Sequence, residues 1–203
     1  MGAGRRFERV SYTARKSATK RIPPRLAVLA LLALVGSLLG PPAKATQAVP
    51  GVGDVVPDFL GRSVDGHPVK ASAYLGKVVV VSFWATWCPP CQKELPVLGG
   101  IEKAGKGEIQ VIAVNVESAG VFRRVAKVLA PLNLLLANDE EERAYGKFGE
   151  KVLPRLVLVG RDGRILKQWT GYGEGEMPEL VRELNSALAA GRAPPDSPDD
   201  PPK

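Results

Sequence analysis

Two cysteines, Cys88 and Cys91, are the residues of this 203-residue chain best suited to do chemistry. They are its only cysteines, and Pro89-Pro90 separates them. A disulfide across two residues closes a very small loop, so it would stabilise the fold only weakly. Two thiols this close are better placed for reversible thiol–disulfide exchange. Inert thiols and half of a zinc site are the alternatives, but one His and two Cys cannot complete a four-ligand Cys/His site.

The surrounding residues predict that this pair lies where a buried strand gives way to a helix. Residues 77–84 are apolar and β-branched, which indicates a central strand, and a helix is expected over about 89–104. At the helix N-terminus, free N–H groups and the macrodipole favour the thiolate of Cys88, which would be the nucleophile. Cys91, one turn further in, is expected to be more buried and to resolve the mixed disulfide. Pro89 and Pro90 suit the first helical turn and leave fewer N–H donors for the thiolate.

Strands and helices alternate through the rest of the central region. Strands are predicted over 109–115, 134–137, 155–160 and 164–169, with a hairpin turn at Asp162-Gly163. Helices are predicted over 118–130, after Asn138 through the acidic turn 139–142 to Lys147, and over 177–188. A βαβ unit followed by a hairpin and a terminal helix predicts an α/β sheet covered by helices on both faces.

The charge of +7 comes entirely from the first 25 residues, which hold eight basic side chains and one acidic one. The remainder is neutral, so a nucleic-acid groove on the folded part is not indicated. The apolar run Leu26–Leu39 is short for a spanning helix, and with Ala43-Lys44-Ala45 it predicts a signal peptide cleaved after Ala45 or an uncleaved anchor. Residues 1–45 are therefore the expected leader, 46–53 a linker, 54–190 the folded domain, and 191–203 a disordered Pro/Asp-rich tail.

The segment Phe83-Trp84-Ala85-Thr86-Trp87-Cys88-Pro89-Pro90-Cys91 resembles the active-site segment of the thioredoxin superfamily. Its continuation through Gln92-Lys93-Glu94-Leu95-Pro96 resembles the TlpA/ResA-like branch of thiol-disulfide oxidoreductases, and Val111–Asn115 and Val152-Leu153-Pro154 agree with it. The resemblance implies a thioredoxin fold with a central mixed sheet, an N-terminal β extension and an α(β) insertion. It also implies a location in the bacterial periplasm or on the outer face of the cytoplasmic membrane.

The resemblance carries further residues into the site. Pro154 matches the family's cis-proline, which faces the disulfide, and Leu153 before it would offer its main chain to an extended substrate. Glu94 matches a glutamate implied in proton transfer with the buried cysteine, a role that a pKa raised by burial would suit. Its alternative is a solvated carboxylate beside Lys93. Ser82 stands where thioredoxin has a buried Asp, so that base is absent.

Other residues near the motif receive structural interpretations. Pro96 is expected to kink the helix, and Trp84 to pack in the core. Trp87, beside the nucleophile, is assigned to the docking surface. His67 is interpreted as a surface residue without metal partners, and Glu117 as a loop charge.

The sequence thus predicts an extracytoplasmic thiol-disulfide oxidoreductase that reduces protein disulfides, with Cys88, Cys91 and Glu94 as catalytic residues. The resemblance implies apocytochrome c or other envelope thiols as clients, a separate membrane electron donor, and no cofactor or metal. We expect a monomer that contacts the membrane if the leader is kept and does not bind nucleic acid. The alternatives are a disulfide-donating oxidase or isomerase and a non-catalytic Cu(I)-binding module. A peroxidase would need a Thr-X-X-Cys motif, and Ala85 stands at its first position.

Overall fold

The computed structural model describes residues 48–149, 151–171, 173 and 175–190. The expected leader over 1–45, the start of the linker and the expected tail over 191–203 lie outside the described residues. In the part of the chain that is described, no helix combines the length and the hydropathy of a membrane span.

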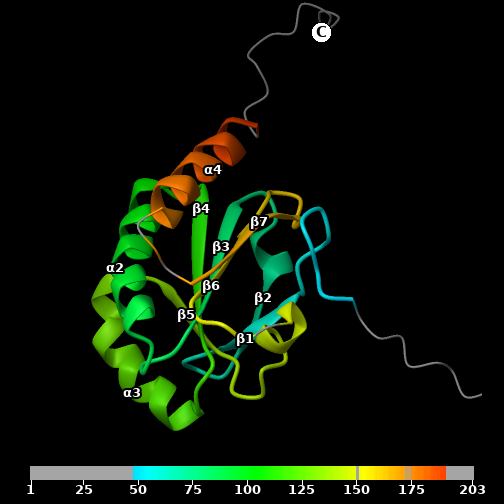
Figure 1. Cartoon of the computed structure of the whole chain (residues 1–203). Helices are drawn as coiled ribbons and strands as arrows, with labels where there is room; N and C mark the ends of the chain where they lie inside the picture. Colours follow the sequence, from blue (N-terminus) through cyan, green and yellow to red (C-terminus); the bar gives the residue numbers. More distant parts are fainter. Residues whose placement is uncertain (1–47, 150, 172, 174, 191–203) are drawn as a thin grey trace, which may run out of the picture. The chain divides into compact units, whose positions relative to one another are not determined.

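A seven-stranded mixed sheet forms the centre of the fold (Figure 1). Its strands are β1 (Phe59–Ser63), β2 (Pro68–Lys70), β3 (Val78–Trp84), β4 (Ile109–Asn115), β5 (Leu135–Asn138), β6 (Arg155–Val159) and β7 (Ile165–Thr170). Their spatial order is β2-β1-β5-β4-β3-β6-β7, in which β3, β4 and β5 are parallel and the other pairs antiparallel. The five strands predicted from sequence periodicity are confirmed to within one residue.

Strand β3 is buried along its whole length, because it lies between β4 and β6 and is covered on both faces. Val79, Val81 and Phe83 face one core cluster, and Val78 and Val80 face another. This two-sided burial explains the unbroken apolar run, since a strand with one solvated face would alternate with polar residues.

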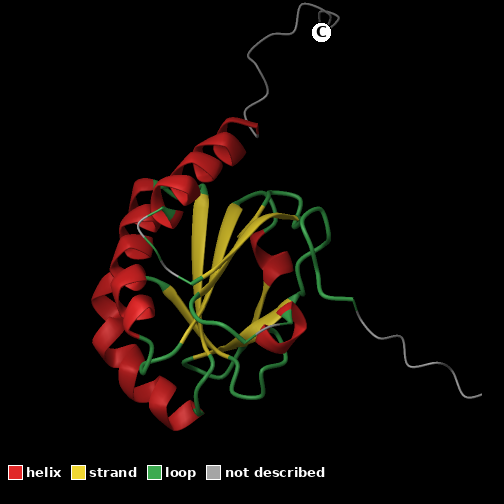
Figure 2. Ribbon diagram, in the orientation of Figure 1, coloured by secondary structure: helices red, strands yellow, loops and turns green. Residues whose placement is uncertain are grey.

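Helices cover both faces, as predicted, but they differ in kind. The three α-helices, α2 (Pro89–Ala104), α3 (Ala119–Leu129) and α4 (Glu176–Ala190), lie on one side of the sheet (Figure 2). The opposite face is covered by the short 3-10 helices η1 (Ala71–Tyr74) and η3 (Tyr145–Phe148), and a third, η2 (Ala130–Leu132), follows α3. The thioredoxin fold expected from the resemblance is therefore present.

The helix predicted from Asn138 to Lys147 is wrong. The carboxylate of Asp139 accepts hydrogen bonds from the backbone N–H groups of Arg143, Ala144 and Tyr145, at 2.9 Å each. Glu142 has a positive φ of 52°, which an α-helix cannot accommodate. Only the 3-10 turn η3 follows, because the side chain of Asp139 binds the N–H groups that would have begun a regular helix.

The strands β1 and β2 form the N-terminal β extension that the resemblance implied, and β1 also pairs with β5. Gly61 makes this close pairing possible. Its φ is 131°, and a Cβ there would lie 2.7 Å from the carbonyl oxygen of Asn138. The extension therefore lengthens the sheet on the side away from β6 and β7.

Candidate active site

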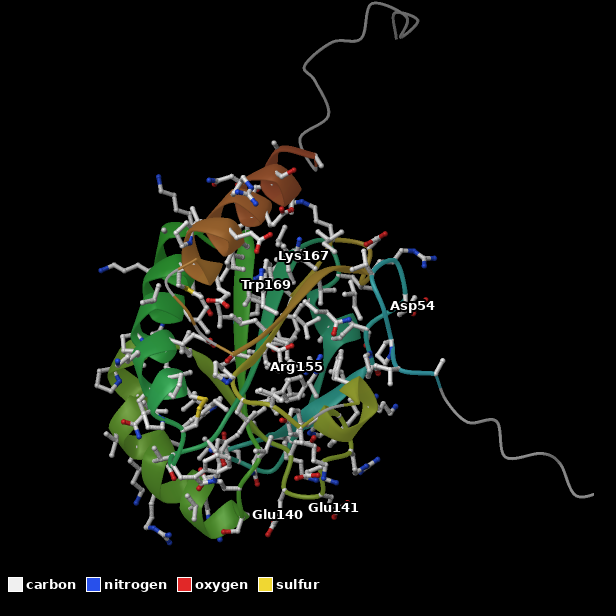
Figure 3. The ribbon with its side chains drawn as sticks, in the orientation of Figure 1. Asp54, Glu140, Glu141, Arg155, Lys167 and Trp169 are labelled. Carbon is white, nitrogen blue, oxygen red and sulfur yellow. A yellow bond between two sulfur atoms is a disulfide. The ribbon has the colours of Figure 1, made fainter. Side chains whose placement is uncertain are left out.

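The two cysteines lie at the carboxyl end of β3, where the chain turns into α2. A β-turn from Ala85 to Cys88, closed by the Cys88 N–H on the Ala85 carbonyl at 3.2 Å, carries the chain from the strand to the helix. Cys88 and Cys91 form a disulfide with their Cα atoms 5.3 Å apart, the yellow bond in Figure 3. The strand–turn–helix context predicted for the pair is confirmed.

Cys88 is the N-cap residue of α2. Its Sγ accepts a hydrogen bond from the N–H of Cys91 at 3.3 Å, while the N–H of Gln92 bonds to the Cys88 carbonyl at 3.2 Å. Pro89 and Pro90 occupy the intervening positions and have no N–H to offer. In the first turn of this helix, one backbone donor therefore reaches the sulfur.

The two cysteines differ in their access to solvent. Cys91 is fully buried, whereas Cys88 is 4% exposed, and the neighbouring Trp87 is 68% exposed. The expectation that Cys91 is the more buried cysteine is confirmed. Cys88 is therefore the cysteine of the pair that has some contact with solvent.

Glu94 lies one turn beyond Cys91 on α2, and its side chain is completely buried. The hydroxyl of Ser82, on β3, donates a hydrogen bond to Glu94 Oε1 at 2.7 Å. Within the described residues, Oε2 is buried without a hydrogen-bond partner. Burial raises the pKa of Glu94 to about 7, because the loss of hydration outweighs the opposing Ser82 hydrogen bond, and the nearby Glu176 adds to the rise. The alternative of a solvated carboxylate is excluded.

The segment before β6 approaches the same site. The peptide bond between Leu153 and Pro154 is cis, as the resemblance implied. Pro154 is buried, and Leu153 packs against the apolar cluster that contains both cysteines and Trp84. Two distant parts of the chain thus meet at the disulfide.

The remaining predictions around the motif have mixed outcomes. Trp84 is 1% exposed and lies in the core, and α2 continues through Pro96. His67 is exposed, as expected. Glu117 lies in the loop after β4, as expected, and its carboxylate accepts two hydrogen bonds from Thr86, in the active-site turn. The sequence contains a signal for this contact. Glu117 and Thr86 each follow the end of a predicted strand, and the parallel strands β3 and β4 end at the same edge of the sheet.

The described residues do not suggest a metal centre. In that part of the chain, no three His, Cys, Asp or Glu side chains are grouped so that they could hold a metal ion.

Comparisons with known proteins agree with thiol–disulfide chemistry at this site. The model of the AhpC/TSA family matches residues 52–168. The thiol-disulfide oxidoreductase ResA of Geobacillus kaustophilus is 27% identical over 169 residues, which cover 82% of this chain and 96% of that protein.

Solved structures are similar as well. A protein of Chlorobium tepidum assigned as the thiol:disulfide interchange protein DsbE aligns with a TM-score of 0.62 and 31% identity, over 68% of this chain and 99% of that one. The exposed lipoprotein thioredoxin of Streptococcus pneumoniae aligns with a TM-score of 0.57 and 26% identity, over 64% of this chain and 99% of that one.

The raised pKa of Glu94 predicts a pH-dependent loss of stability that Glu94→Gln removes. Between the ordinary value of 4.5 and about 7, the folded state binds more protons than the unfolded state, so the unfolding free energy falls as pH rises. With the disulfide intact, we expect the wild-type protein to lose about 3 kcal/mol relative to Glu94→Gln between pH 4 and pH 8.

Urea denaturation at several pH values measures this difference. Exposed Glu141, changed to Gln, is the control and should follow the wild type at every pH. Parallel curves for the wild type and Glu94→Gln would contradict the burial of an ionisable carboxyl.

Proposed function

The chain belongs to the AhpC/TSA family and is a thiol-disulfide oxidoreductase of the ResA type, and from this premise we propose that it reduces protein disulfides outside the cytoplasm. The observation that carries the proposal is the arrangement on α2, in which the reachable Cys88, the buried Cys91 and the buried Glu94 carboxyl follow one another within two helical turns.

The reaction begins with the reduced pair. The Cys88 thiolate attacks a client disulfide, which forms a Cys88–client disulfide and releases one client thiolate. Cys91 then attacks Cys88 Sγ, which forms the Cys88–Cys91 disulfide and releases the second client thiolate. The client gains two electrons, which the cysteine pair loses, and a separate thiol donor must return them.

Glu94 serves the second step as the proton acceptor. Cys91 is fully buried and cannot give its thiol proton directly to solvent, whereas the Glu94 carboxyl lies one turn away on the same helix. A pKa near 7 allows Glu94 to take a proton at neutral pH and to release it afterwards. Ser82 holds one carboxyl oxygen and leaves the other free to receive the proton.

The client docks beside the disulfide on Trp87, Leu153 and Pro154. Trp87 presents a large exposed aromatic surface next to Cys88, which suits contact with an apolar segment. The Leu153-Pro154 segment, just before β6, packs beside the cysteines, and its main chain would pair with an extended client backbone.

A location outside the cytoplasm follows from the basic, then apolar, residues 1–45, because the positively charged end of such a leader stays inside. The related pneumococcal protein, described as an exposed lipoprotein thioredoxin, supports the same location. Disulfides persist in this compartment, so a reductase has clients there. The resemblance to the TlpA/ResA-like branch implies apocytochrome c cysteines as one client and a membrane protein as the electron donor.

The roles of the two cysteines predict opposite results for two substitutions. Cys91→Ser should accumulate a stable mixed disulfide with insulin, because Cys88 can attack but nothing resolves the product. Cys88→Ser should form none, since its remaining thiol is buried. Non-reducing electrophoresis after mixing each reduced protein with insulin checks this, and trapping through Cys91 instead would reverse the assignment.

The proton-acceptor role predicts that Glu94→Gln slows resolution by at least about 10²-fold, the usual scale of general base catalysis. In the wild type the resolution rate should rise with pH through about 7, and this rise should disappear in Glu94→Gln. Stopped-flow measurement of client release from the mixed disulfide gives both. Lys93→Gln, which removes an exposed charge on the same helix, is the control and should keep the wild-type profile.

The direction of electron transfer predicts a low reduction potential. A reductase of protein disulfides should equilibrate with glutathione or dithiothreitol buffers at a potential below about −200 mV, because about 30 mV changes the equilibrium constant of a two-electron couple tenfold. A reduction potential above about −180 mV, in the range of isomerases and oxidants, would contradict the reductase function and favour a protein that donates its disulfide.

A further inference from the structure

Thr86 lies in the turn that brings the chain to Cys88. Each of its polar groups, the N–H, the hydroxyl and the carbonyl, forms a hydrogen bond to another part of the chain. The Thr86 N–H donates to Glu117 Oε2 at 2.6 Å, and its hydroxyl donates to Glu117 Oε1 at 2.8 Å. The Thr86 carbonyl accepts a hydrogen bond from Gln92 Nε2, on α2, at 2.6 Å. Thr86 is thus bound from α2 on one side and from the end of β4 on the other.

Glu117 is itself held in place by the ends of two strands. Asn115, the fully buried last residue of β4, donates through Nδ2 to Glu117 Oε2 at 3.1 Å and accepts the Glu117 N–H at 3.0 Å. Asn138, the last residue of β5, donates to the Glu117 carbonyl at 2.7 Å. The carboxyl ends of β3, β4 and β5 are therefore joined through one residue, Glu117, whose carboxylate binds Thr86 and Asn115 and whose backbone carbonyl binds Asn138.

Thr86 and Trp87 are the two central residues of the turn from Ala85 to Cys88. A turn fixed at Thr86 has little freedom at Trp87 and Cys88, so the same contacts set where the exposed indole projects and where Sγ meets the Cys91 N–H. Small displacements of reacting groups cost large factors in rate. The contact between Glu117 and Thr86 therefore affects the positions of both Cys88, the nucleophile, and Trp87 beside it.

We propose that Glu117 is a positioning residue that fixes the active-site turn through Thr86 and thereby sets the reactivity of Cys88. This inference rests on the proposed disulfide reductase function for its consequence but not for its geometry. Glu117 forms no ion pair among the described residues, so its carboxylate is committed to these hydrogen-bond donors.

Glutamine can test geometry separately from charge. In Glu117→Gln the amide oxygen can accept from the Thr86 and Asn115 N–H groups, and the amide N–H can donate to the Thr86 hydroxyl, which rotates to accept it. Glu117→Ala removes the same charge and also removes all three contacts. The two variants thus form a neutral pair that differs only in whether the turn is held.

The first measurement is the rate of insulin reduction by the full chain. We expect Glu117→Ala to lose about tenfold and Glu117→Gln to stay within about twofold of the wild type. The control is Glu140→Ala, an exposed carboxylate at the bottom of the view in Figure 3, which should be unchanged.

The second measurement needs no client and therefore separates this inference from the proposed function. In a Cys91→Ser background Cys88 is the only thiol, and its alkylation by iodoacetamide is followed against pH. The pH midpoint should be higher in Glu117→Ala than in Glu117→Gln by about half a unit or more, because a loosened turn weakens the Cys91 N–H contact to Sγ.

Equal midpoints and equal insulin rates for the two Glu117 variants would overturn the proposal. The hydrogen bonds to the turn would then have no effect on Cys88, whether or not the negative charge has one. Should Glu117→Ala fail to fold, Thr86→Val removes only the hydroxyl contact. Thr86→Val should lower the insulin rate and raise the pH midpoint, but by less than Glu117→Ala. Thr86→Ser, which keeps the hydroxyl, should behave like the wild type. If Thr86→Val changes neither measurement, the proposal is equally overturned.

Discussion

The site depends above all on the packing of α2 over the central strands β3 and β4, which buries the Glu94 carboxyl completely. An ionised carboxylate loses much hydration free energy when it is buried, and one hydrogen bond from Ser82 compensates only in part. The result is a carboxyl group whose pKa lies near neutrality. The same packing buries Cys91, so the resolving thiol and the carboxyl proposed to accept its proton are both shielded from solvent.

The parallel order of the central strands explains where the remaining parts of the site come from. β3, β4 and β5 run in the same direction, so all three end at one edge of the sheet. The first end supplies the turn to Cys88, the second supplies Asn115 and Glu117, and the third supplies Asn138. Ligand and catalytic sites form at this edge in α/β sheets because loops and helix N-termini meet there. In this protein the meeting point is a hydrogen-bonded network that ends at Thr86.

Local spacing was enough to predict some of these features and not others. The cysteine pair, the strand before it and the helix after it lie within one short segment, so periodicity and helix-end chemistry located them. The motif predicts a role for Glu94, but its hydrogen bond with Ser82 depends on how α2 packs on β3, 12 residues earlier in the chain. Glu117 and Thr86 are 31 residues apart in the chain, and hydrophobic periodicity does not predict a hydrogen bond between two such loop residues. The helix expected after Asn138 was wrong because the Asp139 side chain binds three backbone N–H groups that sequence patterns leave unassigned.

The different surroundings of Glu94 and Glu117 explain why we propose different roles for them. Glu94 is fully buried, and within the described residues only one of its two carboxyl oxygens has a hydrogen-bond donor, so its proton affinity is high and it can exchange a proton. Glu117 is partly exposed, and both of its oxygens accept from donors on neighbouring chain segments, which suits it to hold a turn rather than to move a proton. Their separation also follows from the fold, since one lies on the helix above β3 and the other follows the neighbouring strand β4. The proposed proton transfer and the proposed positioning thus fall on different residues, so each can be altered without removing the other.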